Sequence, residues 1–468
     1  MKKVILICIL AIAVIVTPAS AKYSGGTGEP NTPYQIADAN DLLTLSLNTA
    51  DHDKYIILIA DINLADHNFT ASIIPNFKGN FNGNNHTISN IYINSGNSNL
   101  GFFGQISTNA VIENISLENI NIENLNAGFN TTSTGCLGGM SYINSTVNNC
   151  KVTGSITIEG LYTVSYCGGL IGQHNGSIDN CSFQGSVINR IHGAGGLVGR
   201  NFDGAVITNS ITNCYVESTE RTGGFVGSNY GYISNCFATA DVNSPGLQYY
   251  YTDFTAGFAG HNCGYISNSG CIADISCPNK MDAIGGFVGL NFYNQYSIPS
   301  GIIENCYCQS NIDANDCPQV GGFIGNSGGD RTNPTDPSYA TGKCVIENCY
   351  SATSITLDDY TIDAGGFAGA NFDSRISSCY WDRDILTPQI TQSIVYDVNS
   401  TTENLIGLNT TQMKTQSSFI NWDFINVWDI GENQTYPFLR RCIAGDLDHD
   451  GIVNITDFAI LANNWLKQ

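Results

Sequence analysis

One five-residue glycine motif returns along the chain and limits the folds that the chain can adopt. It consists of a Gly-Gly pair, two apolar residues and a closing glycine, with alanine replacing the first glycine in one copy. Each repeat unit is too short to bury its own apolar face, so neighbouring units must stack. The seven copies lie at residues 168–172, 195–199, 223–227, 256–260, 285–289, 321–325 and 365–369. The repeat therefore predicts an all-β solenoid whose interior is lined by Leu, Phe, Val and Ile.

The segment after each glycine motif supports stacked strands. It holds a polar turn, the pattern Ile-x-Asn-Cys and a short β-prone run, as in residues 231–239. Longer spacings at residues 327–343 and 358–363 indicate loops on one side of the stack. A nucleotide-binding glycine loop is the alternative, but such a loop occurs once, between a strand and a helix. Seven copies without helical sequence between them favour an architectural role for the glycines.

The repeats and the sequences that flank them resemble the GLUG-motif proteins of bacterial surfaces. The resemblance implies a right-handed parallel β-helix-like solenoid with a surface, adhesive or substrate-associated role. It divides the chain into a cap with the first rungs (22–100), the repeat solenoid (101–382) and a C-terminal cap (383–441). In residues 138–142 the last glycine of the motif is replaced, so we expect an irregular rung there. Besides the glycine motifs, the segments that carry the resemblance are residues 31–36, 41–43, 55–64, 77–88, 101–104, 378–382, 411–413, 422–424, 427–428 and 436–440.

The first 21 residues have the pattern of a secretory signal peptide. Two lysines precede an apolar run, and small residues ending at Ala21 form a cleavage signal. A membrane anchor is the alternative, but the apolar run is shorter than the roughly 20 residues that a bilayer-spanning helix needs. We therefore predict Sec-type export with cleavage after Ala21, a secreted or cell-surface location, and a mature chain with no transmembrane segment.

The charge of the chain excludes some partners, and its cysteines leave a question open. The formal net charge is −22, with 18 Lys and Arg against 40 Asp and Glu, so nucleic acid and anionic lipid are expected to be repelled. An exported chain with 17 cysteines would normally suggest disulfides. Besides Cys263, six of the cysteines follow asparagine, which indicates a stacked ladder of core residues that leaves bonding between rungs possible. These six are Cys150, Cys181, Cys214, Cys236, Cys306 and Cys349.

Residues 442–468 contain a candidate calcium-binding loop followed by a helix with an apolar stripe. Oxygen ligands stand at the positions of a calcium loop, and Gly451 stands where the loop must turn sharply. The predicted ligands are Asp446, Asp448, Asp450, the carbonyl of Ile452, Asn454 and Asp457. The segment resembles one dockerin type I repeat, although a complete dockerin has two. It is therefore predicted to be a calcium-stabilised tether or partner-binding segment, with a cohesin-like protein as one candidate partner.

We expect a non-catalytic adhesion or binding protein whose ligand is an extracellular polysaccharide or a cell-surface protein. Exposed tyrosines are candidate carbohydrate contacts, or they fill ordinary β positions. A polysaccharide lyase or glycoside hydrolase is one alternative, with Asp382 and Asp384, or Asp358 and Asp359, as candidate acids. Some immunoglobulin A1 proteases carry GLUG repeats, but this chain has no His-Glu-x-x-His metal motif. A structural cell-envelope protein is the second alternative.

Overall fold

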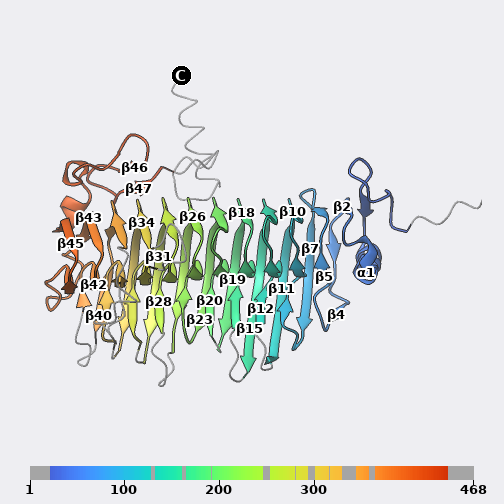
Figure 1. Cartoon of the computed structure of the whole chain (residues 1–468), viewed down its shortest axis with the longest axis horizontal. Helices are drawn as coiled ribbons and strands as arrows, with labels where there is room; N and C mark the ends of the chain where they lie inside the picture. The colour runs from blue at the N-terminus through green and yellow to red at the C-terminus, as the bar shows by residue number, and fades with distance from the viewer. Residues whose placement is uncertain are drawn as a thin grey trace, which may run out of the picture.

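The chain forms one elongated solenoid of stacked β-strands (Figure 1). The computed structural model describes residues 22–127, 132–160, 165–190, 192–245, 253–279, 281–293, 301–315, 317–328, 344–357 and 364–440. The N-terminal cap and the C-terminal cap lie at opposite ends of the stack (Figure 1). Within these ranges no helix is long and apolar enough to cross a membrane. The loops predicted at residues 327–343 and 358–363 fall almost wholly outside the described residues.

A typical rung contributes four strands to three sheets. In one such rung, β16 (Ser165–Gly168) lies in a nine-stranded sheet and β17 (Ile171–His174) in an eleven-stranded sheet. The short β18 (Ser177–Asp179) and the long β19 (Ser182–Asn189) then join a 25-stranded sheet. The strand pairings described in these three sheets are parallel, which confirms the predicted all-β parallel solenoid.

The remaining strands repeat this order along the axis. The nine-stranded sheet also contains β8 (Asn99–Leu100), β12 (Thr132–Gly135), β20 (Gly193–Gly195), β24 (Thr222–Gly223), β28 (Phe254–Ala256), β32 (Ala283–Gly285), β36 (Val320–Gly321) and β41 (Ala364–Gly365). The eleven-stranded sheet also contains β5 (Ile74–Phe77), β9 (Phe103–Ile106), β13 (Gly138–Ser141), β21 (Val198–Asn201), β25 (Val226–Asn229), β29 (Ala259–Asn262), β33 (Val288–Phe292), β37 (Ile324–Gly328), β42 (Ala368–Phe372) and β44 (Ile394–Val398).

The 25-stranded sheet holds two sets of strands. Its short set also includes β1 (Tyr34–Ile36), β2 (Tyr55–Leu58), β6 (Asn80–Asn82), β10 (Val111–Glu113), β14 (Thr146–Asn148), β22 (Val206–Thr208), β26 (Tyr232–Ser234), β30 (Tyr265–Ser267), β34 (Ile302–Glu304) and β38 (Val345–Glu347). Its second set also includes β3 (Ile62–Asn63), β4 (Asn68–Phe69), β7 (Thr87–Asn94), β11 (Ser116–Ala127), β15 (Lys151–Gly160), β23 (Ile211–Ser218), β27 (Phe237–Asn243), β31 (Gly270–Cys277), β35 (Tyr307–Ala314), β39 (Tyr350–Ser351), β40 (Ser354–Leu357), β43 (Arg375–Asp382) and β45 (Thr401–Leu408).

The apolar residues of the glycine motif form a continuous column inside the stack. Phe225, Phe258, Phe287, Phe323 and Phe367 stack face to face, and their ring centroids lie 4.7 to 5.0 Å apart. This distance equals the spacing of about 4.8 Å between paired strands, so each ring contacts the ring of the next rung.

At Gly224 and Gly257, the second glycine of the motif is required by the closeness of the next rung. A Cβ atom on Gly224 would lie 2.2 Å from the carbonyl oxygen of Gly257, which is the equivalent glycine one rung further along. A Cβ on Gly257 would likewise lie 2.5 Å from the carbonyl oxygen of Gly286. Only glycine lets the backbones approach this closely, which confirms its architectural role.

The rung at residues 138–142 is regular, and the expected irregularity was wrong. Strand pairing places Gly135 beside Gly168 and Gly138 beside Ile171. The motif of this rung therefore runs over residues 135–139, its closing glycine is Gly139, and Cys136 replaces the second glycine. The prediction took Gly138 and Gly139 as the first two glycines of the motif, which is three residues out of register.

Five of the Asn-Cys pairs mark a corner between the short and the long strands of the 25-stranded sheet. Each asparagine has the left-handed backbone conformation that asparagine adopts more readily than most residues, with φ between 50° and 56° at Asn149, Asn180, Asn235, Asn305 and Asn348. The cysteine that follows donates its Sγ hydrogen to the carbonyl two residues earlier, over 3.1 to 3.3 Å.

Serine takes the place of cysteine at this corner in two rungs. Ser210 and Ser269 donate to the equivalent carbonyls at 2.7 Å. Ser210 occupies the corner of the rung that contains Cys214, because Ile211 pairs with Ser182. Cys214 therefore pairs with Gly185 and lies outside the ladder. The prediction that Cys214 belongs to the ladder with the other five cysteines was wrong. The fifteen cysteines within the described residues are buried and none forms a disulfide.

A second ladder is polar and follows the ends of the strands in the eleven-stranded sheet. Asn201, Asn229, Asn262 and Asn291 donate amide hydrogens to one another in series, each over 2.8 Å. His174 occupies the same column one rung earlier, where it pairs in register with Asn201 and its Nδ1 lies 2.7 Å from Ser141 Oγ. These amides pair with one another inside the protein, where Oδ1 of Asn201 at the start of the series has no hydrogen-bond partner, and they help to fix the register of the rungs.

Short helices and turns close the two ends. At the N-terminal end α1 (Ala39–Leu47), capped by Asp38, packs Leu42 and Leu45 into the core, and the 3₁₀ helix η1 (Thr49–Asp51) follows. At the C-terminal end lie α2 (Thr410–Met413), the 3₁₀ helix η3 (Gln416–Ser418) and an antiparallel pair, β46 (Trp428–Asp429) with β47 (Phe438–Leu439).

Candidate functional site

The predicted calcium ligands lie outside the described residues. These are Asp446, Asp448, Asp450, Ile452, Asn454 and Asp457, all in the segment that follows Arg440. In the part of the chain that is described, no group of three or more His, Cys, Asp and Glu side chains could hold a metal ion. The calcium site therefore remains a prediction.

The candidate catalytic acids Asp382 and Asp384 hold the C-terminal cap. Asp382 is buried, and its Oδ2 accepts hydrogen bonds from Tyr436 Oη at 2.7 Å and Thr410 Oγ1 at 2.8 Å. Asp384 accepts a hydrogen bond from the amide of Thr410 at 3.2 Å. The two side chains therefore bind residues of the C-terminal cap to the end of β43. Asp358 and Asp359 lie outside the described residues.

Two sets of stacked tyrosines bear on the predicted aromatic strip. Tyr307, Tyr350 and Tyr380 lie beneath the C-terminal cap, where Tyr350 donates to the carbonyl of Pro437 at 2.7 Å. Tyr232 and Tyr265 lie on the neighbouring short strands β26 and β30, with ring centroids 6.0 Å apart, and Tyr232 is exposed. A pair of this kind is smaller than the aromatic strip that the sequence suggested.

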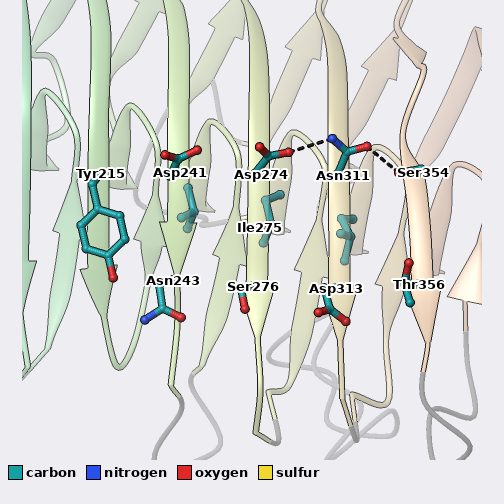
Figure 2. Close-up of a pocket in the computed structure, with 12 residues that line it drawn as sticks. Tyr215, Asp241, Asn243, Asp274, Ile275, Ser276, Asn311, Asp313, Ser354 and Thr356 are labelled. Atoms are coloured by element: carbon teal, nitrogen blue, oxygen red, sulfur yellow. Dashed lines mark hydrogen bonds between the residues drawn. The ribbon is translucent and has the colours of Figure 1, made fainter.

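A groove runs along the outer face of five long strands, β23, β27, β31, β35 and β40 (Figure 2). It has a volume of about 400 Å³. Its outward side chains form two rows because the strands pair in register. The first row is Tyr215, Asp241, Asp274, Asn311 and Ser354, and the second row is Asn243, Ser276, Asp313 and Thr356 (Figure 2).

Hydrogen bonds link neighbouring rungs of the first row. Asn311 donates its amide to Asp274 Oδ1 at 2.7 Å, and Ser354 donates its hydroxyl to Asn311 Oδ1 at 2.5 Å (Figure 2). Asp241, Asp274 and Asp313 are exposed, whereas Val242, Ile275 and Ile312 between the rows are buried. The groove thus carries two rows of polar and acidic side chains on a paired sheet.

Glu217 closes one end of the second row and is ionised. Burial raises its pKa, but hydrogen bonds from Tyr215, Arg190 and Asn243 outweigh burial and hold the pKa below its ordinary value. Tyr215 Oη donates to Glu217 at 2.6 Å and Arg190 Nε at 3.1 Å. Glu217 therefore fixes Tyr215 at the edge of the groove.

The chemistry of the groove suits an extended, hydroxyl-rich polymer. Carboxylate, amide and hydroxyl groups recur at the spacing of about 4.8 Å that separates the rungs. Each can donate to or accept from a hydroxyl group, and ligand sites use a few such groups to fix orientation. Sequence reasoning missed this groove, although the pattern polar-apolar-polar in residues 241–243, 274–276, 311–313 and 354–356 is its signature.

Comparison with known proteins identifies the repeat. Residues 218–243 match the family described as the GLUG motif. The repeat unit at these residues matches the GLUG motif. The matched residues begin at the end of β23 and finish at the end of β27, so one motif corresponds to one rung.

One relative and two solved structures are similar to this chain. Halomucin from Haloquadratum walsbyi is 29% identical over an alignment of 226 residues that covers 45% of this chain and 2% of halomucin. A Bacteroides ovatus protein described as an immunoglobulin A1 protease is 16% identical, with a TM-score of 0.35, over 90% of this chain and 95% of that one. Another structure, named IgA1 protease, is also 16% identical, with a TM-score of 0.38, over 68% of this chain and 21% of that one.

Proposed function

We propose that this protein is an exported, surface-associated GLUG solenoid that binds an extracellular polysaccharide through the groove on β23, β27, β31, β35 and β40, without cleaving it. The observation that carries the proposal is the pair of polar rows, which repeat with the rungs and stand on a rigid, fully paired sheet. The signal-like N-terminus and the likeness to halomucin support a location outside the cell.

The charge of the groove favours a neutral polysaccharide. Asp241, Asp274 and Asp313 are exposed on a chain of net charge −22, so a polyanion would be repelled from this face. A neutral sugar polymer donates its hydroxyl hydrogens to carboxylates and accepts hydrogen bonds from Asn311, Ser276 and Thr356. Several weak contacts along one chain then add to a useful affinity.

The proposal is tested with variants of the groove and one matched control. Asp274→Ala removes a central acceptor and releases Asn311, so binding of a neutral polysaccharide should weaken about tenfold, equivalent to about 1.4 kcal/mol. Glu118→Ala removes an exposed carboxylate from β11, outside the groove, and should leave binding unchanged. Equal affinity of the two variants, measured by calorimetry on residues 22–468, would place the polysaccharide elsewhere.

We also propose that calcium folds residues 442–468 into a tether or a partner-binding segment. The spacing of Asp446, Asp448, Asp450 and Asp457 supports this. Calorimetry should detect one calcium ion per chain, and the double variant Asp446→Ala with Asp450→Ala should abolish its binding. Unaltered calcium binding by the double variant contradicts the assignment.

A further inference from the structure

Two arginines lie close together on the nine-stranded and eleven-stranded sheets, away from the groove. Arg200 lies on β21, in register between Gln173 on one side and Ser228 on the other. Ser228 in turn pairs with His261 on β29. Arg221 directly precedes β24, in the sheet that carries Tyr166 on β16.

Aromatic rings hold the guanidinium group of Arg200 in place. Its Cζ lies 4.6 Å from the ring centroid of Phe202, 4.9 Å from that of Tyr230 and 5.3 Å from that of Tyr166. Its Nη1 also donates to Tyr166 Oη at 3.3 Å. Tyr230 packs edge-on against His261, with centroids 5.7 Å apart. These contacts fix a planar cation, since cation–π contacts are directional and strong when desolvated.

Neither arginine has a carboxylate partner. Within the described ranges Arg190, Arg375, Arg383 and Arg440 all form salt bridges, whereas Arg200 and Arg221 form none. Glu220, which neighbours Arg221 in sequence, is bound by His192 at 3.0 Å. In a chain with 40 acidic residues against 18 Lys and Arg, two adjacent arginines without an acid are a feature that needs an explanation.

Buried nitrogen atoms of this cluster also lack hydrogen-bond partners. Nε of Arg200, Nε of Arg221 and Nδ1 of His261 have none among the described residues, and His261 is only 7% exposed. Burial first, and then the two guanidinium groups, lower the pKa of His261, while burial raises the pKa of Cys263. The thiol of Cys263 lies 3.3 Å from Nε2 of His261. A thiol that donates to Nε2 leaves the ring proton on Nδ1, so the cluster presents three buried N–H donors.

A glycine lies beside the two arginines. Gly193 pairs with Tyr166 in register, and a Cβ atom there would meet nothing nearer than the carbonyl oxygen of Arg221 at 3.5 Å. That Cβ would be in ordinary contact with Arg221 and with the ring of Tyr166, so glycine keeps a larger side chain from crowding the donors. A ligand group that accepts hydrogen bonds and carries negative charge matches these donors.

We propose that Arg200, Arg221 and His261 bind an oxyanion, the sulfate or carboxylate group of an acidic sugar. Arginine matches the planar, two-oxygen geometry of both groups, and the partly exposed ring of Tyr230, which contacts Arg200, provides a surface for the sugar ring. This site is independent of the acidic groove, because the two surfaces lie on different sheets and have opposite charge.

The test uses the mature chain, residues 22–468, with a disaccharide that carries one sulfate group and one that carries one uronate. Inorganic sulfate is the third probe, and all three are measured by calorimetry at constant ionic strength. Arg221→Gln should weaken binding of at least one acidic disaccharide tenfold or more. Arg375→Gln, which removes a partly exposed arginine from β43, should leave its affinity unchanged. Arg200→Lys keeps the charge and should give an intermediate loss.

Three results would overturn the proposal. One is saturable binding of neither disaccharide, and another is equal affinity of the wild type and Arg221→Gln. Inorganic sulfate that binds as tightly as the acidic sugar would show that the sugar ring contributes nothing. Thermal shifts in sulfate do not replace the titration, because excluded salts stabilise all variants alike. Asp274→Ala should keep full affinity for the acidic sugar, which separates this site from the groove.

Discussion

At the residue scale, the asparagine at the corner of a rung is suited to its position by the backbone conformation that it adopts. Asn235 has a φ of 56°, and the same left-handed conformation recurs at the equivalent asparagines of the neighbouring rungs. This conformation costs free energy for residues that have a Cβ atom, and the cost is lower for asparagine than for most of them. The cysteine that follows is a small residue that donates a hydrogen bond to a backbone carbonyl, and serine makes the equivalent bond in two rungs.

Substitutions at Asn235 test this reading of the corner. Asn235→Ala should lower the free energy of unfolding by about 1 to 2 kcal/mol more than Asn235→Gly, because glycine adopts positive φ without strain. On the exposed face of β27, Thr239→Gly should instead destabilise more than Thr239→Ala. Chemical denaturation measures all four. The same order of alanine and glycine at both positions would refute the argument.

His174 should make the stability of the solenoid sensitive to acid. Burial lowers its pKa from 6.5 to about 4, so the neutral ring contributes stability that is complete above pH 6.5 and is lost as the pH falls through 4. His174→Asn extends the asparagine ladder and removes this titration. The difference between wild type and variant should change by about 3 kcal/mol over that range, measured by denaturation at several pH values. Parallel profiles would show that His174 titrates normally.

At the element scale, sequence reasoning found the repeat but not always its register. The glycine motif is conspicuous because close approach of the rungs admits no other residue at positions such as Gly224. The predicted alignments of the rung at residues 135–139 and of Cys214 were wrong because they relied on residue type. Only strand pairing reveals which residues are equivalent between rungs. The interior could thus be predicted from the pattern, whereas outward columns depend on exact register.

The junction between the last rungs and the C-terminal cap depends on Asp382. Asp382→Ala should lower the free energy of unfolding by about 2 to 4 kcal/mol, because Tyr436 and Thr410 lose a buried acceptor. Asp384→Ala should cost less than about 1 kcal/mol, since Asp384 is half exposed. Thermal and chemical denaturation compare the two. Equal effects would mean that the cap is held by its aromatic residues alone.

At the scale of the whole molecule, stacking turns single outward residues into long surfaces. One Asp or Asn on a strand is unremarkable, but parallel pairing lines up Asp241, Asp274 and Asn311 as one row. The spacing between repeats varies along the sequence, so this row could not be read before the register was known. The same stacking brings Arg200, from one sheet, near Arg221, from another.

The central claim is that the groove binds a neutral polysaccharide without cleaving it. The most direct measurement is a screen of residues 22–468 against neutral and acidic polysaccharides, with binding and released sugar recorded for the wild type and Asp274→Ala. The account predicts binding of a neutral polymer, about tenfold weaker in Asp274→Ala, with no new reducing or unsaturated ends. Release of such ends, or neutral-polymer binding that Asp274→Ala leaves intact, would contradict it.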